Sequence, residues 1–475
     1  MFKKVLIANR GEVALRIIRG CEELNIPTVA IYSQADARSL YVKKAQEAYL
    51  IPGDPIKAYL DYHKIVELAK AVGADAIHPG YGFLAENADF ARYCEQNGIT
   101  FIGPKPEHIE LFGDKVRAKK VMRELGLKTI PGSEEPLSDV KKALKVADEI
   151  GYPVLLKSAF GGGGRGMRLV KSPEELPSQF ESAYREASAF FSRGELFVEK
   201  YLRNPKHIEV QILGDKFGNV VHLGERDCSI QRKHQKVIEI TPCPVLPQEI
   251  RSKILGQSLR AMMQVGYESA GTLEFLVDLN TGEFYFIEMN TRLQVEHTIS
   301  EMVTGIDIVE NMLRIAMGEP LMFSQADITF RGYAAEFRIN AEDPLRNFAP
   351  SPGKITAYYS PGGPGIRMDG GVYKDYIIPP YYDSMIAKMS VWALSWDRLI
   401  ARARRALDEF IVRGVPTNIP LHREIVLDPD FIEGRFGIHF LEQKLQSYNL
   451  SPKPDQDPET TALVLAAAIA YYYGL

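Results

Sequence analysis

The chain has 475 residues, of which 45% are hydrophobic and 25% are charged, and its formal net charge is −4. This length predicts roughly three globular domains, and the charge balance excludes a general attraction to nucleic acid or to an anionic membrane. The 38 glycines and 29 prolines are too few for a collagen-like or low-complexity chain.

The cysteines and the longest apolar runs predict a cytoplasmic protein. Cys21, Cys94, Cys228 and Cys243 form neither a CxxC pair nor a zinc-ligand spacing, as expected of a reduced compartment. The N-terminal apolar run is too short for a signal peptide. The apolar stretch at 462–473 is shorter than the roughly twenty residues of a membrane span. We therefore expect no membrane association.

Residues 1–113 alternate predicted strands with predicted helices. The strands fall at 5–8, 27–32, 75–78 and 100–102, and the helices at 13–24, 65–71 and 90–96. This alternation predicts a doubly wound parallel sheet of the α/β class. The first strand-to-helix turn reads Asn9, Arg10, Gly11, Glu12, which is not GxGxxG, so no standard dinucleotide site is expected there.

Residues 114–318 predict a second domain of the α+β class. Helices at 115–126 and 140–149 precede strands at 154–157, 167–170, 196–199, 207–213, 220–226, 271–277 and 284–289. Gly318, Glu319 and Pro320 mark the expected boundary. Residues 331–441 mix strands, Pro/Gly turns and a helix at 396–410, and a tail of open role occupies 442–475.

A glycine-rich loop, Phe-Gly-Gly-Gly-Gly-Arg-Gly-Met, occupies residues 160–167 between two predicted strands. It lacks the Lys-Ser/Thr of a P-loop and does not open a helix as a dinucleotide loop does. A strand–loop–strand flap covers nucleotide phosphates with backbone N–H groups. Lys157, four residues before the loop, is placed to meet an α- or β-phosphate. A flexible linker is the alternative, and the density of glycines favours the flap.

A predicted hairpin at 271–290 turns at Asn280, Thr281 and Gly282. With Thr281 at its centre, Glu274 faces Glu288, and Asn290 lies on the same face. Opposed carboxylates repel unless a cation lies between them, and this set of oxygens suits Mg²⁺ or Mn²⁺ bridging nucleotide phosphates. A solvated polar face is the alternative. The opposite face is expected to carry Leu273, Phe275, Val277, Tyr285, Ile287 and Met289.

The polar alternation continues through Glu288, Asn290, Arg292, Gln294 and Glu296. If this segment is extended, Arg292 offers a fork to a small oxyanion and Glu296 lies beside it as a base. An exposed charged loop is the alternative.

A third motif, at 225–236, is locally cationic and suited to neutralising phosphates. A charge run taken alone is usually a solvated face. His207 and His234 have no ligand-spaced partner, and lone histidines are more often structural than metal ligands.

Ordered sequence blocks closely resemble the biotin carboxylase family of the ATP-grasp enzymes. They span about 1–441 and read ANRGE, HPGYGFLAEN, GGGGRGM, EKYL, HIEVQ, ERDCSIQRKHQKVIE, EMNTRLQVEH, EFRINAEDP and YYDSMIAK. The resemblance implies a doubly wound pre-ATP-grasp domain at 1–113 and an ATP-grasp domain at 114–318 with a mobile lid at about 131–204. It also implies a biotin carboxylase C-terminal domain at 331–441.

The resemblance also implies residue roles. The positions that match nucleotide-binding residues are Lys115, Lys157, Gly163, Gly164, Glu199, Lys200, Tyr201, Leu202, His207, Gln231 and His234. Glu274, Glu288 and Asn290 match ligands of Mg²⁺ or Mn²⁺, through which both glutamates serve the nucleotide. Lys236, Arg292 and the backbone of Val295 match the bicarbonate site. Glu296 matches the base, and Arg338 matches the group that pairs with the biotin enolate.

The implied reaction is the carboxylation of biotin. Glu296 deprotonates bicarbonate, which attacks the γ-phosphate of ATP to give carboxyphosphate, and the CO₂ released is captured by the enolate beside Arg338. Biotin is expected on a carrier protein, with a carboxyltransferase as a further partner and a homodimer as the assembly. The final acceptor stays open among pyruvate, acetyl-CoA and another acyl-CoA. The alternatives are another ATP-grasp ligase and a non-catalytic ATP-binding regulatory subunit.

Overall fold

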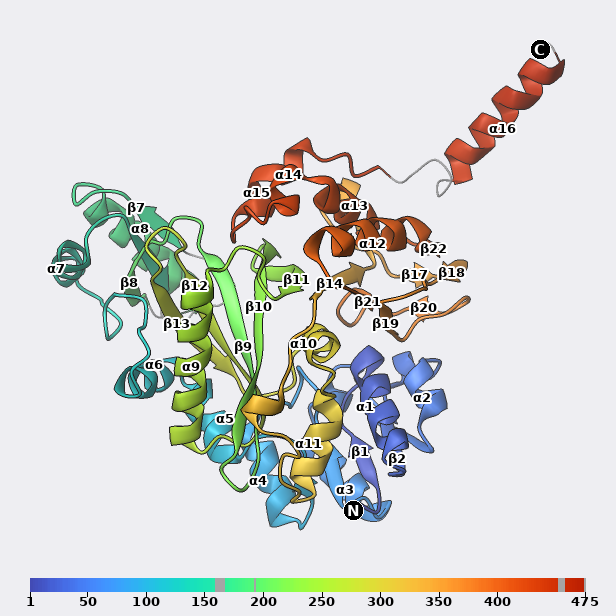
Figure 1. Cartoon of the computed structure of the whole chain (residues 1–475), viewed down its shortest axis with the longest axis horizontal. Helices are drawn as coiled ribbons and strands as arrows, with labels where there is room; N and C mark the ends of the chain where they lie inside the picture. The colour runs from blue at the N-terminus through green and yellow to red at the C-terminus, as the bar shows by residue number, and fades with distance from the viewer. Residues whose placement is uncertain (159–166, 192–193, 452–457, 474–475) are drawn as a thin grey trace.

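The computed structural model describes residues 1–158, 167–191, 194–451 and 458–473 (Figure 1). Its N-terminal part is built on a parallel sheet with strand order β3-β2-β1-β4-β5. The strands are β1 (Val5–Ile7), β2 (Thr28–Tyr32), β3 (Glu47–Leu50), β4 (Ala76–His78) and β5 (Thr100–Phe101). The helices are α1 (Gly11–Glu23), α2 (Leu40–Lys44), α3 (Tyr62–Ala71), α4 (Ala88–Gln96) and α5 (Pro106–Gly113).

Helices cover both faces of this sheet because its first strand is apolar on both. Val5 and Ile7 pack in one core cluster with residues of α1, whereas Leu6 and Ala8 pack in another with residues of α3 and α4. Successive side chains of a strand point to opposite faces, so a continuous apolar run requires cover on each side. The predicted doubly wound α/β fold is confirmed.

The central feature is an antiparallel sheet with strand order β13-β12-β9-β10-β11-β14-β21-β19. Its strands are β9 (Lys206–Gly214), β10 (Val220–Arg232), β11 (Gln235–Thr241), β12 (Ser269–Val277), β13 (Phe284–Asn290), β14 (Tyr333–Asn340), β19 (Ile366–Gly370) and β21 (Met385–Ala393). Strand β11 pairs with β14, so one sheet runs across the sequence boundary expected at 318–320. The helices packed near it include α9 (Gln248–Val265), α10 (His297–Thr304) and α11 (Ile308–Ala316).

A smaller sheet with strand order β7-β6-β8 lies beside α7 and α8 in the segment expected to act as a lid. The elements of this segment are α7 (Val140–Ile150), β6 (Val154–Ser158), β7 (Arg168–Val170), α8 (Leu176–Phe191) and β8 (Leu196–Lys200). Helix α6 (Lys115–Glu124) precedes them in the chain. Strands β6 and β7 are antiparallel, as a strand–loop–strand flap requires. The glycine loop itself, with Gly163 and Gly164, lies outside the described residues.

In the C-terminal part, α12 (Trp396–Glu409) packs against β14 and β21, and α13 (Ile419–Leu427) packs against α12 and β14. Helix α14 (Pro429–Ile432) lies against α13, and α15 (Phe440–Lys444) lies against β10. Short strands complete this part: β15 (Glu342–Asp343), β16 (Ala349–Pro350), β17 (Gly353–Lys354), β18 (Ala357–Tyr359), β20 (Ile377–Ile378) and β22 (Ile411–Arg413).

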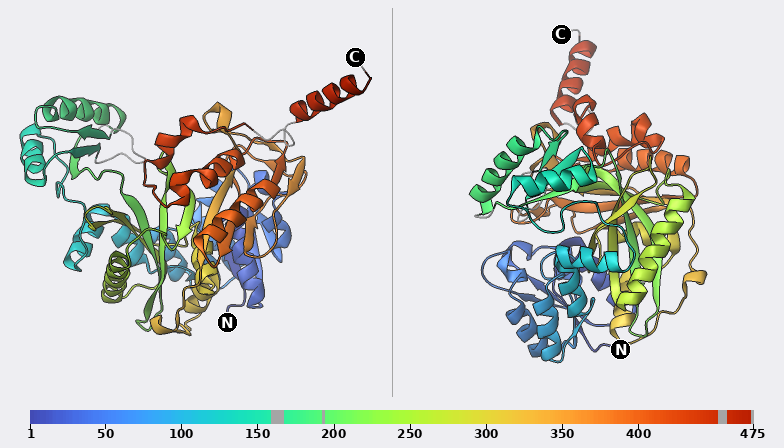
Figure 2. Two further views of the ribbon diagram at one scale, coloured as in Figure 1. Left: turned by 45° about the horizontal axis from the view of Figure 1, so that its top comes forward. Right: turned by 90° about the vertical axis from the view of Figure 1, so that its left-hand side faces the viewer.

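The last helix, α16 (Pro458–Tyr473), projects away from the rest of the chain in every view (Figures 1 and 2). Its apolar side chains are largely exposed, for example Leu463 at 70% and Tyr471 at 91%. Within the described ranges, no helix combines the length and apolar character needed to cross a membrane.

The β12–β13 hairpin has the predicted register near its open end and a different one near its turn. Glu274 pairs with Glu288 as predicted, but the next residue, Phe275, pairs with Phe286. Ile287 is therefore the extra residue of a β-bulge. The register predicted for the residues nearer the turn was wrong by one position.

The bulge also changes which side chains face the core. Tyr285 and Ile287, predicted for the apolar face, lie off it, and Phe284 and Phe286 take their place in the core cluster. A shift of one residue moves every following side chain to the other face, because the side-chain period of a strand is two. Ile287 faces the cavity described below instead.

Candidate active site

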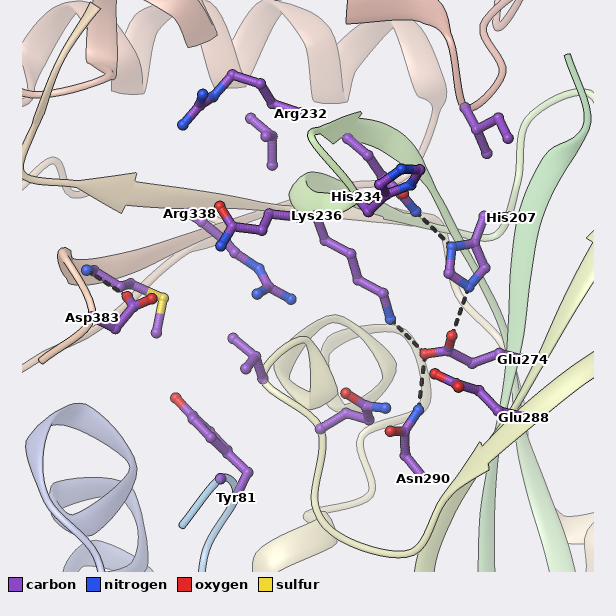
Figure 3. A pocket seen from close by; sticks show the side chains of 18 of the residues that line it. Tyr81, His207, Arg232, His234, Lys236, Glu274, Glu288, Asn290, Arg338 and Asp383 are labelled. Carbon is purple, nitrogen blue, oxygen red and sulfur yellow. Dashed lines mark hydrogen bonds and ion pairs between the residues drawn. The ribbon is translucent and has the colours of Figure 1, made fainter. Parts of the chain in front are cut away.

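A cavity of about 1070 Å³ opens where the N-terminal part, the small sheet, the central sheet and the C-terminal part meet. Tyr81 follows β4, Glu274 comes from β12 and Arg338 from β14 (Figure 3). Lys157 comes from β6. Predicted site residues that line it are Lys115, Lys157, Lys200, Tyr201, Leu202, His207, Gln231, His234, Lys236, Glu274, Glu288, Asn290, Arg292, Val295 and Arg338. Glu199 and Glu296 are buried behind this lining.

A tight turn between β10 and β11 aims Lys236 into the cavity. Lys233 and His234 both have positive φ, 50° and 63°, which is the geometry of a two-residue type I′ hairpin turn. The turn pairs Gln231 with Lys236 across the two strands. Lys236 and Gln231 therefore both reach the same end of the cavity.

Lys236 is the centre of a cluster of carboxylates. Its Nζ lies 2.5 Å from Glu209 Oε2, 2.9 Å from Glu274 Oε1 and 2.6 Å from Glu296 Oε1. Burial opposes the charge on Lys236, but the surrounding acids hold its pKa well above the usual value. Lys236 is a permanent cation beside Glu296.

Glu296 is fully buried between two cations. Its second oxygen, Oε2, accepts a hydrogen bond from Arg338 Nη2 at 2.9 Å. Burial alone would raise the pKa of Glu296, but Lys236 and Arg338 hold it well below the usual carboxyl range. The side chain is an ionised carboxylate at neutral pH, as a proton acceptor must be.

A buried arginine, Arg226, binds Glu209 of this cluster. Arg226 donates from Nε to Glu209 at 2.5 Å and from Nη1 to Gln211 at 2.8 Å and to Ser300 at 3.0 Å. The cationic run at 225–236 is therefore not a solvated face at this position, because β10 is an interior strand of the sheet. Glu209 was not predicted, although the polar alternation His207, Glu209, Gln211 marks the inward face of β9.

The acidic pair on the hairpin fits a divalent cation. Glu274 Oε1 accepts from Asn290 Nδ2 at 2.9 Å, and Glu288 Oε2 lies 2.8 Å from Lys115 Nζ. Lys236 and His207 overcome the effect of burial and hold the pKa of Glu274 far below its usual value, so this carboxylate is ionised. Two carboxylates and an amide are the oxygen donors that Mg²⁺ and Mn²⁺ prefer. The residues present fit the metal implied by the sequence.

Polar side chains on the central sheet continue the cavity wall. His207 Nε2 donates to Glu274 Oε2 at 2.9 Å, and Gln231 Nε2 donates to His207 Nδ1 at 2.6 Å. Each ring nitrogen of His207 thus has a partner, which fixes the orientation of the ring.

Glu199 balances the lysines that enter from the small sheet and α6. It forms ion pairs with Lys157 and, at 2.9 Å, with Lys119. Burial opposes its charge, but the two lysines lower the pKa of Glu199 below the usual range. Lys157 is consequently held at the cavity edge rather than in open solvent.

The segment after β13 does not stay extended, so the condition under which Arg292 and Glu296 would share one strand face is not met. Strand β13 ends at Asn290, and α10 begins at His297, with Glu296 in the cap position just before it. In the turn between them, His297 Nδ1 contacts the Gln294 carbonyl at 2.8 Å, and the His297 N–H donates to the same oxygen. Arg292 Nη2 donates to Asn290 Oδ1 at 3.1 Å. Arg292 and Glu296 still reach one site, through a turn rather than through strand alternation.

Two acids outside the predicted set hold the site's arginines. Glu86 Oε2 accepts from Arg292 Nε at 2.8 Å, and Glu239 Oε1 accepts from Arg338 Nε at 2.6 Å. Burial raises the pKa of Glu239 to about 7. Glu86 lies within HPGYGFLAEN, but nothing in the spacing of that block connects it to Arg292.

Family models match three consecutive stretches of the chain. They are "Biotin carboxylase, N-terminal domain" at residues 1–109, "Carbamoyl-phosphate synthase L chain, ATP binding domain" at 114–324 and "Biotin carboxylase C-terminal domain" at 336–443. The biotin carboxylase of Pseudomonas aeruginosa is 51% identical over 447 residues, which is 94% of this chain and 99% of that protein. The chain belongs to the biotin carboxylase family. The predicted family and the predicted fold class are confirmed.

A second relative matches this chain over its whole length. The 2-oxoglutarate carboxylase small subunit of Hydrogenobacter thermophilus is 54% identical over 475 residues, covering 100% of both chains. A crystal structure of the biotin carboxylase domain dimer of that enzyme, in complex with MgADP, ADP and bicarbonate, has a TM-score of 0.89 at 55% identity. It covers 95% of this chain and 100% of its own.

Proposed function

We propose that this chain carboxylates biotin with bicarbonate at the expense of ATP, giving N1′-carboxybiotin, ADP and phosphate. The observation that carries the proposal is the ionised Glu296 carboxylate held between Lys236 and Arg338, next to the paired acids Glu274 and Glu288. Membership of the biotin carboxylase family supports it, as does the related structure in complex with MgADP and bicarbonate.

The nucleotide end of the cavity is proposed to bind MgATP. Lys115 and Lys157 would contact its phosphates together with backbone of the glycine loop, including Gly163 and Gly164. Further binding positions are proposed at Glu199, Lys200, Tyr201, Leu202, His207, Gln231 and His234. Glu274, Glu288 and Asn290 would hold Mg²⁺ or Mn²⁺, which supplies charge neutralisation at the transferring phosphoryl group.

The other end is proposed to bind and activate bicarbonate. Lys236, Arg292 and the Val295 N–H would bind the anion, and Glu296 would take its proton as bicarbonate attacks the γ-phosphate. Carboxyphosphate hydrolyses readily, so the segment at about 131–204 is assigned the role of a lid that excludes water. These roles require Glu296 to be ionised, which its pairing with Lys236 and Arg338 supports.

The biotin ring is assigned to the Arg338 end of the cavity. As the ureido N1′ proton leaves to phosphate, negative charge develops on the ureido oxygen, and the Arg338 guanidinium would stabilise it. The enolate then attacks CO₂. Arg338 is oriented for this by Glu239 and Glu296, which hold Nε and Nη2.

The test is ADP release by the full chain with MgATP, bicarbonate and free biotin. Dependence on all three substrates is the expected result. ADP release that ignores biotin would favour another ATP-grasp ligase, and binding of ATP without turnover would favour a regulatory subunit. Either outcome would refute the proposal.

We further propose that the chain serves a carboxylase with a 2-oxo acid acceptor, receiving biotin on a carrier and passing it to a carboxyltransferase. The support comes from comparing two alignments. The 2-oxoglutarate carboxylase small subunit aligns with all 475 residues of this chain, including the tail. The Pseudomonas biotin carboxylase aligns with only 447 residues, which already cover 99% of that protein. The carboxyltransferase that co-purifies with the chain should accept 2-oxoglutarate or pyruvate. Exclusive use of acetyl-CoA would refute this assignment.

A further inference from the structure

A buried lysine, Lys388, lies beside the site without lining the cavity. It belongs to β21, where it pairs directly with Arg338 on β14 and with Asp369 on β19. Residues paired directly across antiparallel strands project from the same face of the sheet. The side chains of Lys388 and Arg338 therefore leave the sheet together, toward the turn at 291–296.

Lys388 reaches the backbone of that turn. Its Nζ donates to the Val295 carbonyl at 2.8 Å and lies 3.2 Å from Glu12 Oε1, and its side chain is fully buried. The hydroxyl of Tyr81, a cavity residue, donates to the same Glu12 oxygen. One ammonium thus connects β21, the start of α1 and the turn that carries Glu296.

Two cations consequently hold two consecutive residues of one turn. Arg338 binds the Glu296 side chain, and Lys388 binds the carbonyl of the peptide that joins Val295 to Glu296. The preceding carbonyl, of Gln294, is held by His297. The peptide held by His297 carries the Val295 N–H, and the peptide held by Lys388 leads to the Glu296 Cα. The two planes meet at the Val295 Cα, so release of either one changes the turn that presents both groups.

We propose that Lys388 is a positioning residue for bicarbonate activation, acting through the Val295–Glu296 peptide. This inference rests on the proposed function, in which the Val295 N–H binds bicarbonate and Glu296 deprotonates it. Replacing a whole buried ion pair by apolar side chains is often at least as stable as the pair itself, so the Lys388–Glu12 pair is not explained by stability alone. Its use here is explained by the ammonium donor that the turn needs.

The test is Lys388→Met in the full chain, assayed by biotin-dependent ADP release. We expect the KM for bicarbonate to rise and kcat to fall, each by about 10- to 100-fold, since small displacements of reacting groups have effects of that size. The KM for ATP should stay within about twofold, because Lys388 contacts none of the proposed nucleotide residues. An unchanged KM for bicarbonate in a folded variant would overturn the inference.

The matched control is Lys206→Met. Lys206 is equally buried and also binds one carboxylate and one carbonyl, those of Asp227 and Gly434, but it does not touch the turn. The Lys206→Met variant should have a lower melting temperature but the wild-type KM for bicarbonate. A matching rise in that KM would show that loss of any buried lysine produces the effect, and would overturn the inference.

A double variant separates positioning from charge balance and covers the case in which Lys388→Met fails to fold. Glu12→Gln with Lys388→Met removes the carboxylate left without its partner, so stability should recover. The raised KM for bicarbonate should persist. If the double variant recovered both its stability and the wild-type KM for bicarbonate, Lys388 would only neutralise Glu12, and the inference would be overturned. A wild-type chain without biotin-dependent turnover would instead refute the proposed function, so the two failures are distinguishable.

Discussion

Replacing Glu296 by Gln changes one oxygen to an amide nitrogen at the centre of the site. The carboxylate now accepts from Lys236 at 2.6 Å and from Arg338 at 2.9 Å. The amide has one acceptor for two cationic donors, so at least one charge-assisted hydrogen bond, worth about 1.5–3 kcal/mol, is lost. The variant also lacks the proposed base, whose removal lowers a rate by about 10²- to 10⁴-fold, equivalent to roughly 3–5 kcal/mol of activation free energy.

The assay is biotin-dependent ADP release at saturating bicarbonate, with nucleotide affinity measured separately. Turnover should fall by the factor above while ATP affinity is retained. The matched control is Glu239→Gln, which removes the other acid on Arg338, an acid whose pKa burial already raises to about 7. The control should lose far less activity than Glu296→Gln. Turnover of Glu296→Gln within about tenfold of wild type would refute the role of Glu296 as base.

Three further predictions concern other residues. Arg338→Ala should reduce carboxybiotin formation more than bicarbonate-dependent ATP cleavage, and equal losses would contradict an enolate role. Burial lowers the pKa of the His78 imidazole to about 3, against 6.5 when unfolded. The unfolded state therefore binds more protons between these values, and stability should fall by up to about 1.4 kcal/mol per unit as pH drops from 6.5 to 3. His78→Asn should unfold with a shallower acid dependence, measured by urea titration at several pH values, and equal slopes would contradict this. Removal of residues 452–475 should leave the melting temperature unchanged, because the apolar side chains of α16 are exposed, and a clear drop would show that the helix is bound.

Patterns of period two and 3.6 predicted four of the five strands of the N-terminal sheet, all but β3, and most of the site's strands. The pairing of Glu274 with Glu288 was predicted correctly, although the register near the turn was not, because the one-residue bulge at Ile287 restores the predicted register beyond it. The replacement of Ile287 by Phe286 on the core face could not be predicted, since a bulge leaves no mark in the polar and apolar alternation.

The supporting acids of the site were beyond local patterns. Glu86 and Glu239 lie 206 and 99 positions from the arginines they bind. Spacing rules for strands and helices reach only a few residues along the chain, so such partners require the tertiary fold. The polar alternation suggested Glu296 as a base, and the resemblance to a family added the role of Arg338. The geometry supplied the contacts that hold both side chains in place.

The turn at 291–296 is held by side chains that come from both earlier and later parts of the sequence. Glu86 is synthesised long before it, and Arg338 and Lys388 long after it. In chain order, strands β9 to β13 come before the two cations on β14 and β21. A chain that ended at residue 320 would carry Lys236, which binds Glu296, but neither Arg338 nor Lys388. The contacts that hold the turn are complete only when β14 and β21 have joined the sheet, so Glu296 gains its final surroundings from the part of the sheet that is latest in the sequence.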